Sequence, residues 1–343
     1  MNKGHRLYQE DLGRILSTDG IGDIGGKRFL ITGATGMVGT CLIDALMRFN
    51  SDHPGGEVTV YAVGRSRERA ESRLGEYFTL PFLHFIEQDV RDPFPADLKA
   101  DYIIPLASNT HPLAYSQYPV ETIEINVKGA ENALTKAVEC RATVLYPSSV
   151  EIYGNGDKVF TEDFTGKLNL STARACYTES KRVCEALCQS YVSEYGIDCR
   201  IVRLSRLFGP TMLESDTKAS SQFILKALAG EDIVLKSKGN QLFSYTYVAD
   251  AVRAILFALL HGKCSEAYNV AGCDVRLADF AQGCAALAGK RVVFDLPSEA
   301  EAKGYSIATK AVMSIDKISA TGWQPAYSFE DALKRTYLIL KNG

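Results

Sequence analysis

The feature that most constrains the fold is a glycine-rich loop that joins an apolar strand to a helix near the N-terminus. Residues 28–32 form an apolar run, which predicts a strand buried on both faces. Glycines follow at 33, 36 and 39, and a helix is expected at 40–49. Such glycines permit a sharp turn, let a pyrophosphate approach the backbone and let the helix pack closely. The segment therefore predicts a dinucleotide site, formed by Gly33, Thr35, Gly36, Met37, Val38 and Gly39.

Apolar strands and amphipathic helices alternate after this loop. Further strands are expected at 58–63, 83–86, 102–106 and 143–146, and the longest helices at 119–139 and 177–195. This alternation predicts an α/β fold, a Rossmann-type doubly wound parallel sheet with a smaller C-terminal α+β substrate lobe.

We expect three parts along the chain. These are an N-terminal helical extension (1–25), a dinucleotide-binding Rossmann domain (26–205) and a lobe that mainly binds substrate (206–343). Segments near 240–272 are expected to return to the first domain.

Composition excludes several classes of protein. A net charge of -3 over 343 residues argues against a nucleic-acid partner. The N-terminus lacks an apolar signal segment, and the apolar stretch 251–260 is short and carries Arg253, so no membrane span is expected. The nine cysteines include no Cys-x-x-Cys pair, which predicts reduced thiols in a cytoplasmic protein. Cys184 and Cys188 lie one helical turn apart but have no histidine pair beside them, so no metal is expected.

The end of the second strand bears on the choice of cofactor. An acidic residue there would favour NAD, but the chain has Arg65 and Arg67, which can receive a 2′-phosphate. We therefore expect NAD or NADP, with NADP slightly favoured from Arg65; the alternative is that both arginines are solvated charges at the start of a surface helix. Asp89, after the third strand, can bond the adenine amino group or be an ordinary turn residue.

Two segments carry candidate catalytic residues. Ser149 lies at the end of the fifth strand, and Tyr177 and Lys181 are four residues apart on one helical face. A lysine ammonium near a phenol is expected to lower the phenol pKa. Tyr177 can then take a proton from a substrate hydroxyl while hydride leaves for a nicotinamide, and Ser149 can orient the same oxygen.

Together these motifs resemble the extended short-chain dehydrogenase/reductases of the NAD-dependent epimerase/dehydratase family, most closely the UDP-glucuronate decarboxylases. The resemblance is carried by 106–112, 126–129, 175–185, 208–210, 223–228, 247–250, 268–269 and 322–325. It implies that Ser149, Tyr177 and Lys181 are the catalytic triad and that Asn126 supports a proton relay to Lys181. The cofactor is then expected to contact Val90, Leu106, Ala107 and Ser108 as well as Tyr177 and Lys181. Ser108, Ser149, Phe223 and Phe243 are expected to contact the substrate.

Glu151 lies two residues after Ser149, so both point to one side of an extended segment. Decarboxylases and some 4,6-dehydratases of the family carry an acidic residue here; the alternative is a turn carboxylate. The chain departs from the family where Arg206 replaces an asparagine and where Phe243 replaces an arginine. We expect Arg206 or Lys218 to hold the substrate diphosphate instead.

The resemblance implies a nucleotide-sugar substrate whose C4 is oxidised before decarboxylation or dehydration. A 4-epimerase, an NADPH-dependent 4-keto-sugar reductase and a non-enzymatic dinucleotide-binding regulator remain alternatives. The helix that carries Tyr177 has an apolar face with Cys184, Cys188 and Tyr191, which predicts a homodimer through paired helices.

Overall fold

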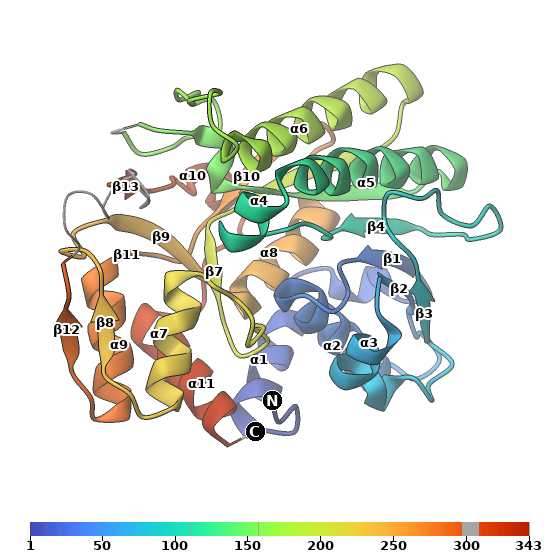
Figure 1. The fold of residues 1–343 in the computed structure, drawn as a ribbon. Helices are drawn as coiled ribbons and strands as arrows, with labels where there is room; N and C mark the ends of the chain where they lie inside the picture. The colour runs from blue at the N-terminus through green and yellow to red at the C-terminus, as the bar shows by residue number, and fades with distance from the viewer. Residues whose placement is uncertain (111, 157, 297–308, 343) are drawn as a thin grey trace.

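Seven parallel strands form the central sheet of the computed structural model, which describes residues 1–110, 112–156, 158–296 and 309–342. Their order is β3-β2-β1-β4-β5-β6-β10, and every neighbouring pair is parallel (Figure 1). The predicted Rossmann-type sheet is therefore confirmed. The strands are β1 (Arg28–Thr32), β2 (Thr59–Gly64), β3 (Leu83–Glu87), β4 (Tyr102–Pro105), β5 (Thr143–Ser149), β6 (Cys199–Leu204) and β10 (Ala267–Val270).

Helices cover both faces of this sheet. Because side chains alternate along a strand, Phe29 and Ile31 of β1 belong to one buried cluster and Leu30 to the other. The first cluster includes α2 (Met37–Asp52) and α8 (Val248–His261), and the second includes α5 (Pro119–Cys140) and α6 (Ala175–Tyr195). The remaining elements of this domain are α3 (Arg67–Leu74), α4 (Pro112–Gln117) and the short helices η1 (Ile21–Ile24), η2 (Gly75–Tyr77) and η3 (Val150–Tyr153).

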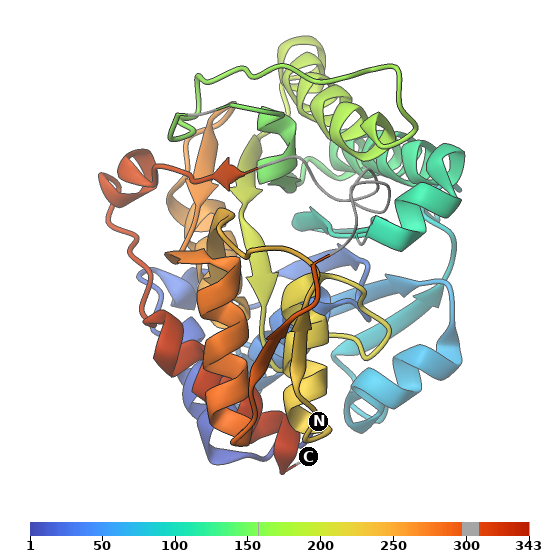
Figure 2. The same ribbon diagram turned by 60° about the vertical axis from the view of Figure 1, so that its left-hand side comes forward.

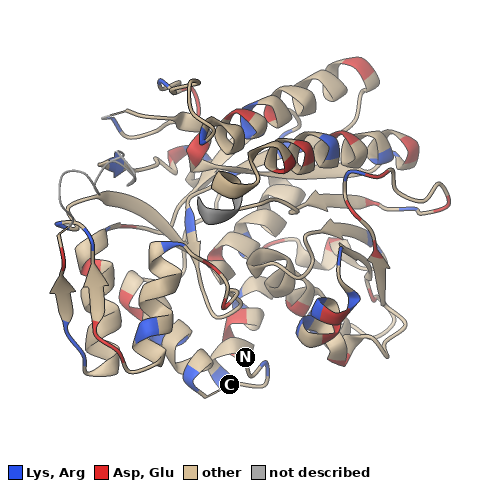
Figure 3. Ribbon diagram, viewed as in Figure 1, with Lys and Arg blue, Asp and Glu red and all other residues tan. Residues whose placement is uncertain are grey.

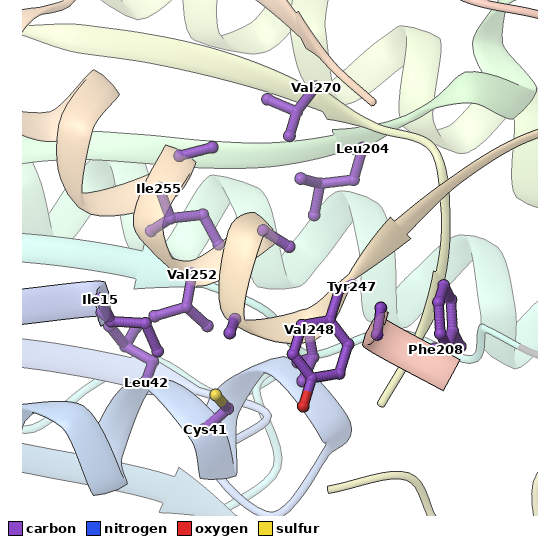
Figure 4. Packing of buried hydrophobic residues seen from close by; sticks show 14 of the residues in the cluster. Ile15, Cys41, Leu42, Leu204, Phe208, Tyr247, Val248, Val252, Ile255 and Val270 are labelled. Carbon is purple, nitrogen blue, oxygen red and sulfur yellow. The ribbon is translucent and has the colours of Figure 1, made fainter. Parts of the chain in front are cut away.

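Helix α8 is apolar around most of its circumference because it lies between the sheet and other helices. Val252 and Ile255 are fully buried, with Leu42 of α2 below them and Val270 of β10 above (Figure 4). The segment 240–272 thus divides between the two parts of the molecule: α8 and β10 lie in the first domain, whereas β9 (Leu242–Tyr247) belongs to the second.

The second lobe packs beside the carboxyl ends of the central strands (Figures 1 and 2). Strand β9 pairs in parallel with β7 (Arg206–Phe208) and β13 (Lys310–Ala311), and antiparallel with β11 (Cys273–Arg276). A two-stranded sheet joins β8 (Ile233–Leu235) to β12 (Val292–Phe294). The helices of the lobe are α7 (Ala219–Leu228), α9 (Leu277–Ala288), α10 (Asp316–Ser319) and α11 (Phe329–Lys341).

The N-terminal helix α1 (Arg6–Leu16) is packed into the body of the protein. Leu12 and Ile15 of this helix are buried in the hydrophobic core. The Tyr8 hydroxyl donates a hydrogen bond to Asp44 of α2 at 2.5 Å. The Asp11 carboxylate pairs with Arg335 of α11 at 3.0 Å, so the helix connects both parts of the molecule.

Charges of both signs are mixed over the ribbon in the view of Figure 3. In the described part of the chain, no helix combines the length and apolar character that crossing a bilayer requires.

Candidate active site

The glycine loop lies at the carboxyl end of β1, where the strand order reverses toward β4. Gly33 has φ +63°, and a Cβ there would lie 2.7 Å from the Ala107 amide nitrogen. A Cβ at Gly39 would lie 2.4 Å from the Gly33 carbonyl oxygen. These two glycines therefore let the loop after β4 and helix α2 pack against the turn.

Helix α2 begins directly after Gly36, which offers no side-chain cap. The amides of its first turn, including those of Met37 and Val38, lack acceptors within the helix, and the helix dipole adds partial positive charge. This is a local geometry that binds a pyrophosphate. Thr35 lies in the loop between β1 and α2, and its methyl group lies beside Gly64 at the end of β2.

The loop after β4 is tied to the glycine turn and to α5. The Thr32 hydroxyl accepts a hydrogen bond from the Ala107 amide at 3.1 Å. Ser108 donates to Asn126 at 2.6 Å, and the Asn126 amide donates to Ser180 of α6 at 2.8 Å. Leu106, Ala107 and Ser108 are half-buried at this edge of the sheet.

The residues expected at the adenosine end engage other protein groups. Arg65, about half exposed, pairs with Glu121 of α5 at 2.8 Å. Arg67 begins α3 and its guanidinium lies over the Phe78 and Phe85 rings. Asp89 is held by Arg91 at 2.8 Å, which lowers the pKa of its carboxyl.

Val90, the neighbour of Asp89, is buried against Gly129 of α5. Its carbonyl oxygen accepts a hydrogen bond from Asn132 of the same helix at 2.8 Å. These contacts fix the end of β3 against the helix that also carries Asn126.

Ser149 and Tyr177 meet at the carboxyl end of β5. The Ser149 hydroxyl oxygen accepts the Glu151 amide at 3.2 Å, and the Ser149 hydroxyl lies near enough to the Tyr177 phenol to act on its pKa. Burial raises the Tyr177 pKa, the Ser149 hydrogen bond lowers it, and the negative charge of Glu151 raises it again. The two predicted catalytic hydroxyls are thus brought together.

The Tyr177 pKa is not lowered as the sequence predicted, and Lys181 contacts groups other than the Tyr177 phenol. Its Nζ donates to the Pro147 carbonyl at 2.9 Å and lies 4.8 Å from the centre of the Tyr146 ring. The Tyr177 pKa is raised instead, because burial disfavours the phenolate and Glu151 adds a negative charge. Burial also lowers the pKa of Lys181.

Asn126 lies beside Lys181 in the interior. A small pocket between the ends of β1 and β4 and helices α5 and α6 is lined by Thr32, Asn126, Gly129 and Lys181, among others. The Asn126 carbonyl accepts a hydrogen bond from the Cys184 thiol at 3.2 Å. The pocket lies between β1, which precedes the glycine turn, and α6, the helix that carries Tyr177.

Glu151 and Arg206 form an ion pair beside these hydroxyls. Glu151 Oε1 lies 3.4 Å from Arg206 Nη2, and Arg206 Cζ lies 3.8 Å from the centre of the Phe243 ring. Strand β9 carries Phe243 and pairs with β7, which begins at Arg206, so the sheet of the second lobe holds this stack. The structure therefore brings Glu151, Arg206 and Phe243 together.

The two other expected substrate residues lie elsewhere in the second lobe. Lys218 immediately precedes α7 and pairs with Asp216 at 2.9 Å. Phe223 is buried, with its ring 6.4 Å from that of Phe280, in the core between α7 and α9. Phe223 thus packs the lobe and offers little surface to a substrate.

Tyr115 of α4 is a site residue that the sequence reasoning missed. Its ring stacks on that of Tyr177, with centres 5.5 Å apart, and the Arg174 guanidinium lies 6.0 Å from the Tyr115 ring centre. Burial and the charge of Glu151 raise the Tyr115 pKa to about 12. No periodic pattern singled out Tyr115, although it follows the loop that contains Ser108.

A dinucleotide fits these residues. The glycine turn brings the backbone to the start of an uncapped helix, and the carboxyl ends of β1 and β5 carry the hydroxyls of Thr32 and Ser149. Fold and site together define a Rossmann-type, dinucleotide-dependent enzyme with a serine–tyrosine–lysine constellation.

Comparison with known proteins identifies the family. Residues 29–271 match the model of the NAD dependent epimerase/dehydratase family, and the chain belongs to that family. The chain is 33% identical over 319 residues to UDP-glucuronic acid decarboxylase 1 of Xenopus tropicalis, which covers 90% of this chain and 71% of the relative. It is 34% identical over 249 residues to UDP-glucuronic acid decarboxylase 6 of Arabidopsis thaliana (71% of this chain, 68% of the relative).

Solved structures support the fold. A dTDP-glucose 4,6-dehydratase of Streptomyces venezuelae with NAD and TYD bound superposes with a TM-score of 0.77 at 25% identity, covering 92% of this chain and 97% of that one. A UDP-glucuronic acid 4-epimerase of Bacillus cereus, in complex with UDP-glucuronic acid and NAD, gives 0.77 at 20% identity (92% and 99%). The protein is an NAD-dependent enzyme of this family.

Proposed function

We propose that this protein oxidises C4 of a nucleotide-linked hexuronic acid and then releases the C5 carboxylate as CO2. The observation that carries the proposal is the placement of the Glu151–Arg206 ion pair beside Ser149 and Tyr177. The names of the relatives described above point to the same reaction.

In the first step, Tyr177 takes the proton of the C4 hydroxyl and Ser149 hydrogen-bonds the same oxygen. NAD would be held on the glycine turn, where its oxidised form would accept the hydride in this oxidation and its reduced form would return it in the final reduction. The hydrogen bond from Ser149 favours the phenolate of Tyr177 and so assists proton removal.

In the second step, the C4 ketone lies next to the carbon that bears the carboxylate. The bond between C5 and the carboxylate breaks, its electron pair forms the enolate of the C4 ketone, and CO2 leaves. C5 then needs a proton, which comes from solvent water, and we assign the Glu151 carboxyl to relay it, because Glu151 follows Ser149 by two residues. Tyr177 returns its proton to the C4 oxygen when the ketone is reduced.

The same Glu151 supports one second candidate, loss of water across C5 and C6. In that reaction the carboxylate removes the C5 proton after the C4 ketone has acidified it. Arg206 beside Glu151 favours decarboxylation, because a substrate carboxylate needs a cation near it.

A mass-spectrometric assay separates the two reactions. The protein is incubated with UDP-, CDP-, GDP- and dTDP-linked sugars, including UDP-glucuronic acid, and with either NAD or NADP. We expect a product that has lost CO2. Loss of water would favour the dehydratase, and a gain of two hydrogens would favour the reductase. A product of unchanged mass that NMR identifies as an isomer would favour the epimerase. Absence of turnover despite bound dinucleotide would contradict the proposal.

For the cofactor, we propose that NADP is accepted through Arg65. No acidic side chain occupies the end of β2, and Arg65 is more than half exposed although it pairs with Glu121.

For assembly, we propose a homodimer through α5 and α6, which expose Ile123 and Val183 at 44% and 45%. Cys184 and Cys188 are buried inside the monomer, so they do not contribute to this face as the sequence suggested.

We place the enzyme in the cytoplasm, a proposal supported by nine cysteines that are all free thiols.

A further inference from the structure

Arg206 is fixed by three separate elements. The residue begins β7, its Nη2 lies 3.4 Å from Oε1 of Glu151, and its Cζ lies 3.8 Å from the centre of the Phe243 ring. Glu151 follows β5 of the central sheet and Phe243 belongs to β9 of the second lobe. A planar guanidinium stacked on a ring and paired on one edge is preorganised, because few rotamers remain to be lost on binding.

One edge of this guanidinium makes no hydrogen bond to the described protein groups. Arg206 Nη1 is buried and has no hydrogen-bond partner among the residues that the structure describes. A buried donor without an acceptor costs free energy, which an acceptor on a ligand would recover. A carboxylate is the acceptor whose shape and charge match an arginine edge best.

The cation lies at the sugar end of the site. Glu151 is two residues from Ser149, and its charge acts on both Tyr177 and Tyr115. Arg206 also acts on Tyr115, the ring that stacks on Tyr177. We therefore place the C5 substituent of a substrate whose C4 oxygen lies between Ser149 and Tyr177 on the side of Arg206.

We infer that Arg206 is the specificity-determining residue for the C5 carboxylate, which its Nη1 edge binds while Glu151 and Phe243 hold the guanidinium in place. This inference rests on the proposed function, because it requires a hexuronic acid in the site. It assigns Arg206 to the sugar carboxylate instead of the diphosphate. Arg206 then supplies a cation next to Phe243, the position where the family resemblance leads one to expect an arginine.

The test compares an acidic with a neutral sugar. Calorimetry on protein loaded with the reduced dinucleotide, which cannot accept hydride from C4, measures the affinity for UDP-glucuronic acid and for UDP-glucose, which differ at C6. Arg206→Met should weaken UDP-glucuronic acid binding by about tenfold or more, the effect of losing one charged hydrogen bond. UDP-glucose binding should change less than about twofold. In turnover, KM for UDP-glucuronic acid should rise more than kcat falls.

Two further variants serve as controls. Arg206→Lys keeps the charge but loses the planar fork, and should give an intermediate loss for UDP-glucuronic acid alone. Arg276→Met removes an exposed arginine from β11 of the same sheet and should leave both affinities unchanged. Melting curves show whether each variant is folded, and if Arg206→Met unfolds, Arg206→Lys carries the comparison.

The outcomes separate the two proposals. Equal weakening of both sugars, or no weakening of either, overturns the assignment of Arg206, as does a wild-type protein that does not prefer UDP-glucuronic acid. If the preference for UDP-glucuronic acid depends on Arg206 but no CO2 is released, the role assigned to Arg206 is supported and the proposed decarboxylation is rejected.

Discussion

Tyr177 receives opposing electrostatic influences from two neighbours on one short segment. The Ser149 hydrogen bond stabilises the phenolate, whereas burial and the Glu151 carboxylate destabilise it. The balance raises the Tyr177 pKa, so the fraction of enzyme with a competent base increases as the pH rises. Substrate oxidation should therefore accelerate toward alkaline pH.

This balance predicts the effect of Glu151→Gln. Removing the negative charge lowers the Tyr177 pKa, so the rise of C4 oxidation with pH should move to lower pH, while the later step is lost. Stopped-flow absorbance of the reduced cofactor, recorded over a pH series, measures the shift. Glu179→Gln, on α6 beside Arg182, is a matched control and should leave the profile in place. A shift of the Glu151→Gln profile to higher pH would contradict the assigned influence.

A second prediction concerns Arg65. If Arg65 receives the 2′-phosphate, Arg65→Glu should weaken NADP by about tenfold or more through loss of a charge-assisted contact. NAD affinity should stay the same or improve, since an acidic residue at this place bonds ribose hydroxyls. Fluorescence titration with each reduced cofactor measures both constants. Arg67→Glu provides the comparison, because the Arg67 guanidinium lies over aromatic rings. If Arg65→Glu changes the affinities for NAD and NADP equally, Arg65 does not receive the 2′-phosphate.

The junction between β1 and α2 depends on Gly33 and Gly36 for different reasons. Gly33→Ala places a Cβ 2.7 Å from the Ala107 nitrogen at φ +63°, so we expect misfolding or a loss of several kcal/mol. Gly36 has φ -77° and its nearest contact would be 3.2 Å away, so Gly36→Ala should fold but bind dinucleotide weakly. Melting curves and calorimetry separate the two effects. Gly13→Ala, in open space on α1, should be neutral or stabilising.

The N-terminal helix gives another prediction. Ile15 is fully buried and packs close to Leu42 of α2 (Figure 4), so α1 is part of the main core. Ile15→Ala should lower the free energy of unfolding by about 2–5 kcal/mol through lost burial and a cavity. Denaturant unfolding measures this loss, and Arg6→Ala, an 85% exposed position, should change it by less than about 0.5 kcal/mol. If Ile15→Ala and Arg6→Ala both change the free energy of unfolding by similarly small amounts, α1 does not contribute to the stability of the core.

For the whole molecule, the proposed dimer depends on the apolar outer face of α5 and α6. Ile123→Glu with Val183→Glu should convert the dimer to a monomer, because charges would be buried at the helix pairing. Light scattering measures the mass in solution. Val293→Glu, at a 42% exposed valine on β12, is the control and should leave the mass unchanged. A monomeric wild-type protein would reject the dimer.

Much of the first domain followed from local pattern. The strand at 28–32 and the helix that ends at Tyr195 match β1 and α6, because an apolar run and a helical period are properties of adjacent residues. Strand β5 extends beyond the expected 143–146 to Ser149, since pairing with β6 continues it. The burial of Cys184 and Cys188 and the stacking of Tyr115 on Tyr177 depended on neighbours distant in sequence.

Sequence alone determined the chemistry that the chain carries: a turn that only glycine permits, a helix start that binds phosphate, and a tyrosine and a lysine one turn apart. Tertiary structure decided how these groups act. Burial raises the Tyr177 pKa, Lys181 turns to a backbone carbonyl, and β7 and β9 bring Arg206 to Glu151. The physical reason is that solvation and charge pairing depend on which distant segments meet, whereas backbone geometry and helical spacing are local.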